Sequence, residues 1–274
     1  MQLAVELVNV SKGFARSAPA SRWWWRSRRR ELALHPIDLA LPAGGTTGII
    51  GPNGSGKSTL VRILSTLLIP DSGVARVFGA DVVREARVVR RHVNRVSVEA
   101  AFYKQLSAWE NLTYAARIYG TPMPGLRERT EALLERFGLR RRYLDRPLRQ
   151  LSRGQQQKVA IARSLLTTPS LLLMDEPTTG LDPRSKREVQ HMVEDLRRER
   201  DVTIVVCTHD LDEAEALCDR VLLLDRGRVL ADGTPAELGP LEPLFFDKSG
   251  RAMADADADD EEEHEQQEEV RTAC

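Results

Sequence analysis

The strongest constraint on this chain is a glycine-rich segment between an apolar run and a helical pattern. Residues 51–59 read GPNGSGKST, which fits the phosphate-binding loop pattern G-x-x-x-x-G-K-[ST], the Walker A motif. Residues 47–50 before it are predicted to form a short buried strand, and residues 60–64 after it the first turns of a helix. A loop in this position points backbone N–H groups and the positive end of the helix dipole at a bound triphosphate.

This loop predicts the groups that would bind a nucleotide. Lys57 is expected to reach the β- and γ-phosphates of ATP, and Ser58 to bind Mg²⁺. The glycines allow backbone angles that a Cβ would forbid. The alternative is a glycine-rich turn that binds nothing. The predicted ATP-binding residues of the loop are Gly51, Pro52, Asn53, Gly54, Ser55, Gly56, Lys57, Ser58 and Thr59.

Length and composition indicate one large domain, or one domain with a subdomain. The chain has 274 residues, of which 42% are hydrophobic, so it can bury a core. No apolar run approaches the length of a membrane-spanning helix, and the N-terminus lacks the layout of a signal peptide. We therefore expect a soluble, cytoplasmic chain. The three cysteines have no metal-site spacing, and Cys207 is expected to be a small buried hydrophobe.

The charges are unevenly distributed although the net charge is zero. Residues 247–274 carry 11 acidic and 3 basic residues, a net charge of −8, and residues 252–269 are mainly alanine and acidic residues with no aromatic residue. We predict that this segment is a disordered acidic tail that follows a folded domain at residues 1–246. The arginine-rich remainder contains none of the common nucleic-acid-binding motifs, so no nucleic-acid partner is expected.

Apolar runs alternate with helical patterns, which predicts an α/β fold with a parallel sheet covered on both faces. Residues 100–168 are predicted to be mainly helical, and residues 17–30 form an insertion rich in Trp and Arg. Strands are predicted at 3–10, 37–41, 171–174, 202–207, 221–224 and 228–230, and helices at 107–119, 126–137, 155–166, 184–200 and 211–218.

Two carboxylates follow the apolar strand predicted at residues 171–174. Asp175 is expected to bind Mg²⁺, directly or through water, because the carboxyl ends of strands face the ligand in an open α/β sheet. Glu176 is expected to deprotonate the attacking water as a general base. The alternative is that the acid pair before Pro177 only starts a helix.

Residues 151–155, Leu-Ser-Arg-Gly-Gln, precede another predicted helix, and alone they would be interpreted as a helix cap. With the other motifs they resemble the signature of ABC-transporter ATPases, usually Leu-Ser-Gly-Gly-Gln. From about residue 3 to residue 238 the chain resembles an ATP-binding subunit of that family. The motifs follow the family's order: 51–59, 151–155, 171–176, the D-loop at 180–182, and His209.

The resemblance implies a P-loop NTPase (RecA-like) core with an antiparallel β subdomain and a helical subdomain. It also implies that two such subunits, in a homodimer or heterodimer, associate head to tail with ATP between the loop of one and the signature of the other. His209 would contact the γ-phosphate, and Asp182 would belong to the D-loop. Phe14 would stack on adenine, or else be a core phenylalanine. The signature residues that would serve the partner's nucleotide are Ser152, Arg153, Gly154 and Gln155.

Two positions depart from the family pattern. Arg153 replaces a signature glycine and adds bulk and charge near the nucleotide. The family's glutamine at the junction between core and helical subdomain has no obvious counterpart. Glu99 is the best match, as a ligand of water or metal, and Gln105 is the alternative.

Three further runs, 109–112, 212–220 and 232–238, resemble prokaryotic drug-resistance ATPases of the daunorubicin type. Those ATPases power export through a separate membrane permease, which would hold the chain at the inner face of the cell membrane. The alternatives are the ATPase of an importer and a soluble ABC ATPase in cofactor assembly. A chromosome or repair ATPase would need a long coiled coil, which the sequence lacks. Trp23, Trp24 and Trp25 would contact the permease or bilayer; the alternatives are that the insertion folds over the nucleotide or that the tryptophans pack on the domain surface.

Overall fold

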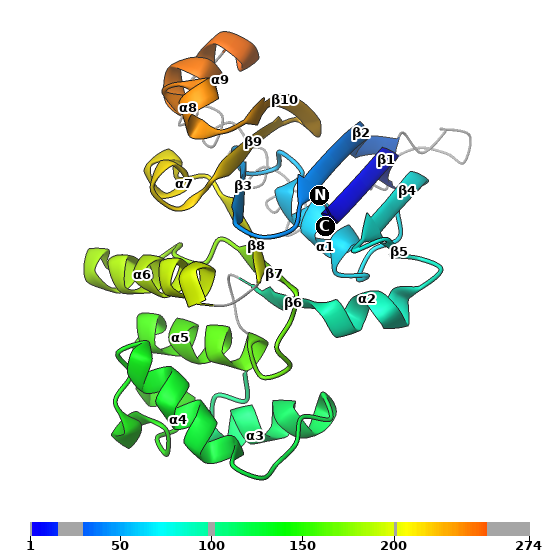
Figure 1. Cartoon of the computed structure of the whole chain (residues 1–274). Coiled ribbons are helices and arrows are strands. Elements are labelled where there is room, and N and C mark those ends of the chain that lie inside the picture. Colours follow the sequence, from blue (N-terminus) through cyan, green and yellow to red (C-terminus); the bar gives the residue numbers. More distant parts are fainter. Residues whose placement is uncertain (1, 16–29, 98–101, 200–201, 251–274) are drawn as a thin grey trace, which may run out of the picture.

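The computed structural model describes residues 2–15, 30–97, 102–199 and 202–250, which form two β-sheets and a group of helices (Figure 1). The Trp-rich segment 17–29, Glu99 and most of the predicted acidic tail lie outside these residues. The α/β fold is confirmed, with a largely parallel sheet at its centre.

The larger sheet has six strands in the order β10-β9-β3-β8-β7-β6. The inner strands are short apolar runs buried along their whole length, as expected where helices cover both faces. All neighbouring pairs are parallel except β9 and β10, which form a hairpin. The strands are β3 (Thr46–Ile50), β6 (Val93–Val96), β7 (Leu171–Asp175), β8 (Thr203–Thr208), β9 (Arg220–Asp225) and β10 (Arg228–Gly233).

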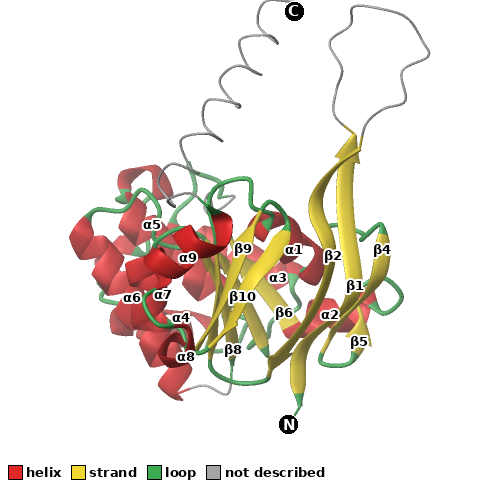
Figure 2. Ribbon diagram, turned by 90° about the horizontal axis from the view of Figure 1, so that it is seen from above, coloured by secondary structure: helices red, strands yellow, loops and turns green. Residues whose placement is uncertain are grey.

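The smaller sheet is antiparallel and lies beside the first (Figure 2). Its order is β2-β1-β4-β5, and its apolar residues share one core with helix α1 and with one face of the larger sheet. Helix α1 (Lys57–Leu64) therefore carries the phosphate loop between two sheets. The strands are β1 (Leu3–Ala15), β2 (Arg30–Pro42), β4 (Ser72–Val77) and β5 (Ala80–Asp81).

A second core joins the opposite face of the larger sheet to the helices. Three helices, α3, α4 and α5, lie together at one end of the molecule, below α6 in Figure 1. Among the described residues no helix is long and apolar enough to cross a membrane. The other helices are α2 (Ala86–His92), α3 (Ala108–Ile118), α4 (Leu126–Arg136), α5 (Arg153–Ser164), α6 (Pro183–Glu199), α7 (Leu211–Leu217), α8 (Pro235–Leu238) and α9 (Leu241–Ser249).

Several element boundaries differ from the predictions. Strands β1 and β2 are longer because they pair with each other as far as Ala15 and Arg30, so Arg30 belongs to a strand and not to the insertion. Helix α2 and strand β6 were not predicted; β6 has polar residues at its centre and is recognisable only by its pairing with β7. Helix α9 runs to Ser249, past the predicted start of the tail at Asp247, because buried Phe245 anchors it on the core.

Candidate functional site: a phosphate loop facing two carboxylates

The phosphate loop connects β3 to α1, and backbone angles and close packing require glycine at several of its positions. Gly54 and Gly56 have φ angles of 70° and 106°, a region that side chains disfavour. A Cβ on Gly51 would lie 1.9 Å from the carbonyl oxygen of Leu224, so only glycine fits there. The backbone N–H of Gly227 donates to the carbonyl of Ser55 at 2.9 Å. The neighbouring β-hairpin therefore holds the loop in shape.

Two side chains of the loop are prepared for an anion. The Lys57 ammonium is buried and donates to the carbonyl oxygens of Gly51 and Pro52 at 2.6 and 2.8 Å, so the loop curls around a positive charge. The hydroxyl of Ser55 is buried with no hydrogen-bond partner among the described residues. A buried polar group normally has a partner, and a phosphate oxygen would supply one. The loop therefore fits the phosphates of ATP.

Ser58 and Asp175 meet across the sheet although 117 positions separate them. The Ser58 hydroxyl donates to Asp175 Oδ1 at 3.1 Å. Burial raises the pKa of Asp175, while the hydrogen bond from Ser58 and the charge of Arg95 oppose the rise. Both side chains offer hard oxygen atoms, which Mg²⁺ prefers, so they would hold the ion together with water and phosphate oxygens. Among the described residues, no three or more His, Cys, Asp or Glu side chains form a group that could hold a metal ion.

Glu176 lies beside His209 at the ends of β7 and β8. Glu176 Oε1 is 3.2 Å from His209 Nδ1, and Oε2 accepts a hydrogen bond from the Thr179 hydroxyl at 2.8 Å. Burial would raise the pKa of Glu176, but the hydrogen bonds from His209 and Thr179 outweigh it and hold the pKa below its ordinary value. Glu176 also has a φ of 49°, the kind of backbone strain that is often found at functional sites. The carboxylate is therefore ionised at neutral pH and able to accept a proton.

The structure excludes the helix-cap interpretation of Asp175 and Glu176. The next helix, α6, begins only at Pro183. Its N-terminus is capped by Asp182, whose Oδ1 accepts from the backbone N–H groups of Arg184 and Ser185 at 3.1 Å. Hydrogen bonds from Ser185 lower the pKa of Asp182, so this cap is charged. Asp182 thus supports the D-loop, and the acid pair faces the phosphate loop instead.

The predicted signature forms the start of α5. The Ser152 hydroxyl accepts from the Gln155 N–H, and Gln155 Oε1 accepts from the Ser152 N–H, so the two residues form a capping box. Gly154 packs against α6: a Cβ there would lie 2.4 Å from Ser185 Oγ. Arg153 reaches the D-loop, with a guanidinium nitrogen 2.7 Å from where a Cβ of Gly180 would be. The signature and the D-loop of one chain are therefore in contact.

A profile of the ABC transporter family matches residues 34–179, just over half of the chain and the part that includes the phosphate loop, the signature and both carboxylates. The chain belongs to the ABC transporter family. This match confirms the family predicted from the motifs, and similarity to a daunorubicin/doxorubicin resistance ATP-binding protein supports the predicted drug-resistance branch.

Known ABC proteins resemble the chain over most of its length. It is 45% identical over 206 residues to the daunorubicin/doxorubicin resistance ATP-binding protein DrrA of Streptomyces peucetius, covering 75% of this chain and 62% of DrrA. It is 38% identical over 210 residues to the methionine import ATP-binding protein MetN of Caulobacter vibrioides, covering 75% and 63%. The chain thus spans less than two thirds of either relative.

A solved ABC structure also superposes on the chain. The ATP-binding cassette MJ0796, determined as a dimer in a post-hydrolysis state with ADP and Pi, matches with a TM-score of 0.71 at 30% identity. The match covers 84% of this chain and 98% of MJ0796. The predicted ABC ATPase fold is confirmed.

The structure also shows the positions of Phe14, Gln105 and Cys207. Phe14 is 43% exposed near the end of β1, with the Lys12 ammonium 5.8 Å from its ring, so it is not the core phenylalanine of the alternative interpretation. Gln105 is exposed in a turn before α3. Cys207 is buried as expected.

Sequence reasoning missed the residues that support the turn at residues 175–179. Thr179 binds Glu176 directly, and Thr178, Thr208 and Glu213 form a buried hydrogen-bonded cluster behind it. The two threonines that follow Pro177 were the available signal, because their hydroxyls can donate hydrogen bonds to nearby carboxylates. Glu213 lies in the run 212–220, but the sequence did not indicate its role, because its partners are 35 and 5 positions away.

Proposed function

We propose that this chain binds ATP with Mg²⁺ and hydrolyses it to power a membrane exporter. The observation that carries the proposal is the meeting of the phosphate loop with the carboxylates at the end of β7, through the hydrogen bond from Ser58 to Asp175. A phosphate loop alone would bind a nucleotide. A buried metal-binding carboxylate and an ionised base beside it are what hydrolysis needs in addition.

The residues divide the chemistry between them. Lys57, Ser55 and the N–H groups of the loop bind and orient the phosphates, and Ser58 with Asp175 holds Mg²⁺. When bound, Mg²⁺ neutralises charge on the β- and γ-phosphates. Glu176 accepts a proton from the attacking water, a contribution of roughly 10²–10⁴ in rate. His209 fixes the Glu176 carboxylate and offers a ring nitrogen toward the γ-phosphate.

The working unit is proposed to be a head-to-tail dimer with a second ABC subunit. Two features of the signature support this proposal. Helix α5 begins at the molecular surface, and Arg153 is an exposed cation at its first position. A helix N-terminus with an added cation suits an anion brought by a partner. Ser152, Gly154 and Gln155 would then face the partner's γ-phosphate.

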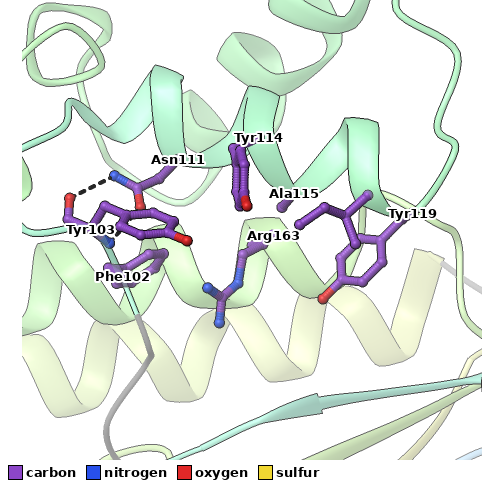
Figure 3. A pocket seen from close by; sticks show the side chains of 8 residues that line it. Phe102, Tyr103, Asn111, Tyr114, Ala115, Tyr119 and Arg163 are labelled. Atoms are coloured by element: carbon purple, nitrogen blue, oxygen red, sulfur yellow. Dashed lines mark hydrogen bonds between the residues drawn. The ribbon is translucent and has the colours of Figure 1, made fainter.

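The permease is proposed to contact a groove in the helical part of the molecule. This groove, of about 390 Å³, lies between the segment 102–103, α3 and α5 (Figure 3). Tyr103, Tyr114 and Tyr119 line it and are about half exposed. Asn111 hydrogen-bonds the backbone of Tyr103 in both directions, at 2.9 and 3.1 Å, which holds one wall in place. Exposed aromatic residues around a preformed groove are typical of a protein interface.

The first experiment measures Mg²⁺-dependent ATP hydrolysis by the purified chain. We expect Lys57→Ala to weaken ATP binding itself, because it removes the cation that the loop encloses. Arg62→Ala, which removes a cation from the far end of α1, is the matched control. ATP binding by the Lys57 variant equal to wild type would contradict the assignment of the loop.

The second experiment tests the permease. The chain is co-expressed with a candidate permease and purified in detergent, and Tyr114→Ser is expected to reduce co-purification without changing the basal ATPase rate. Phe246→Ser removes an equally exposed aromatic residue from α9 and should have no effect. If both variants co-purify like wild type, the groove is not the contact.

An importer is the second candidate, favoured by the similarity to MetN. The two transport directions share the same ATPase, and uptake and efflux assays in vesicles that contain the chain and its permease separate them. A soluble ABC ATPase in cofactor assembly would co-purify with no membrane protein at all.

A further inference from the structure

A buried carboxylate, that of Glu213 on helix α7, lies behind the turn that carries Glu176. Glu213 is 1% exposed and occupies the third position of the helix. Its Oε1 accepts a hydrogen bond from the Thr178 hydroxyl, and its Oε2 accepts one from the Thr208 hydroxyl, each at 2.8 Å. Thr178 is two residues after Glu176, and Thr208 directly precedes His209. One carboxylate therefore joins the two segments that carry Glu176 and His209.

Helix capping does not explain this carboxylate. In a capping box the acid at the third position accepts from the backbone N–H of the cap residue. Here the cap is Asp210, which accepts from the Glu213 N–H at 2.9 Å, while the Asp210 N–H donates to the Thr208 hydroxyl at 3.0 Å. The helix is thus capped without the Glu213 side chain, which is turned inward instead.

Packing does not explain it either. Burial raises the pKa of Glu213, although the hydrogen bonds from Thr178 and Thr208 oppose the rise. Lys186 and Asp210 also face this carboxyl, and they form an ion pair with each other. Keeping a carboxyl out of water is costly, and an apolar side chain would fill the space at lower cost. The role of Glu213 is therefore explained by the two segments that it connects, through Thr178 and Thr208.

We propose that Glu213 is a positioning residue for hydrolysis: by bridging Thr178 and Thr208 it sets the Glu176 carboxylate against His209. This inference rests on the ATPase activity proposed above. The bridge is short and rigid, since both of its threonines are buried and each is bound to a different oxygen. Without it, the turn after β7 and the loop after β8 lose this side-chain link and keep the backbone hydrogen bond from the Glu176 N–H to the Cys207 carbonyl, which does not hold the side chains of Glu176 and His209.

The test compares kcat with ATP binding in four variants. Glu213→Ala, Thr178→Val and Thr208→Val should each lower kcat, on the order of 10- to 100-fold for the first, because displacing a reacting group by about 1 Å has effects of this size. ATP binding should change little, because the phosphate loop is untouched. Glu213→Gln should recover most of the lost rate, since its carbonyl still accepts from one threonine and its amide can donate to the other.

Asp212→Asn is the matched control, because it removes a charge from the same helical turn at an exposed position. The valine variants keep the size of the threonines and guard against misfolding of Glu213→Ala. Wild-type kcat in both valine variants, or losses of kcat matched by equal losses of ATP binding, would overturn the proposal. If the wild-type chain itself hydrolyses no ATP, the proposed function fails and this inference falls with it.

Discussion

The catalytic turn, residues 175–179 with His209, and the signature edge, residues 151–155, are built in opposite ways. Glu176 and Asp175 are largely buried and receive hydrogen bonds from α1, from their own turn and from the loop after β8. At the signature edge Ser152 is exposed, and within the described residues its side chain bonds only within its own helical turn. The first region is organised by segments from across the fold. In the second, the Ser152 cap lies within one helical turn, and Gly154 and Arg153 pack against α6 and the D-loop.

This difference indicates which part of the site one chain can complete alone. The catalytic turn has its partners within the chain, so its geometry exists before any dimer forms. The signature edge satisfies its own backbone and leaves exposed side chains facing outward, which suits contact with another subunit.

The largest effect is expected at the catalytic turn. Glu176→Gln should slow hydrolysis roughly 10²–10⁴-fold, because it removes the general base. ATP binding should remain, and an ATP-bound dimer should accumulate. Steady-state ATPase rates and size-exclusion chromatography with ATP measure the two effects. Turnover like that of wild type would mean that the turn is not the catalytic region.

The next effect is expected at the signature edge. Ser152→Arg should preserve ATP binding by the monomer and prevent ATP-driven association, because it adds bulk and charge to the face that would receive the partner's phosphate. Light scattering of this variant in a Glu176→Gln background gives the measurement. Ser152→Ala is the control, since it removes the cap, which costs about 1 kcal/mol, without adding bulk. Association as strong as that of the parent would show that this edge does not face a partner.

A smaller effect concerns the glycine of the signature. Gly154→Ala should destabilise the chain by about 1–3 kcal/mol, because the new methyl overlaps Ser185 of α6. Urea unfolding of this variant, of Ser185→Gly and of the double variant forms a cycle. We expect the double variant to be less destabilised than the sum of the two single changes. Strict additivity would show that the close contact between α5 and α6 does not constrain this position.

The smallest effect is a pH dependence of stability at Asp175. Burial raises its pKa above the ordinary 3.8, so the native state binds the proton more tightly than the unfolded chain. Wild type therefore loses stability as the pH rises from about 3.8 through the raised pKa, and Asp175→Asn lacks this loss. Melting temperatures without nucleotide or Mg²⁺ should favour the variant increasingly with pH. A difference that is constant with pH would mean that the native pKa is not raised.

Much of the site was predictable because its motifs are local. The phosphate loop needs a strand, glycines and a helix in immediate succession, and all of them lie within residues 47–64. The acid pair directly follows an apolar strand, so its place at the sheet edge followed from the sequence alone. The capping box at Ser152 and Gln155 spans four residues and is equally local. In each case residues that act together are also neighbours in the chain.

Long-range pairing decided the rest. Strand β6 has two polar residues among its four and is a strand because β7 lies beside it. The contact of Arg153 with Gly180 depends on the packing of α5 against α6. The bond from Ser58 to Asp175 and the bridge from Glu213 to Thr178 join segments that only the folded sheet brings together. The sequence determined which chemical groups are available, but tertiary structure decided which of them meet, because hydrogen bonds depend on distances in space.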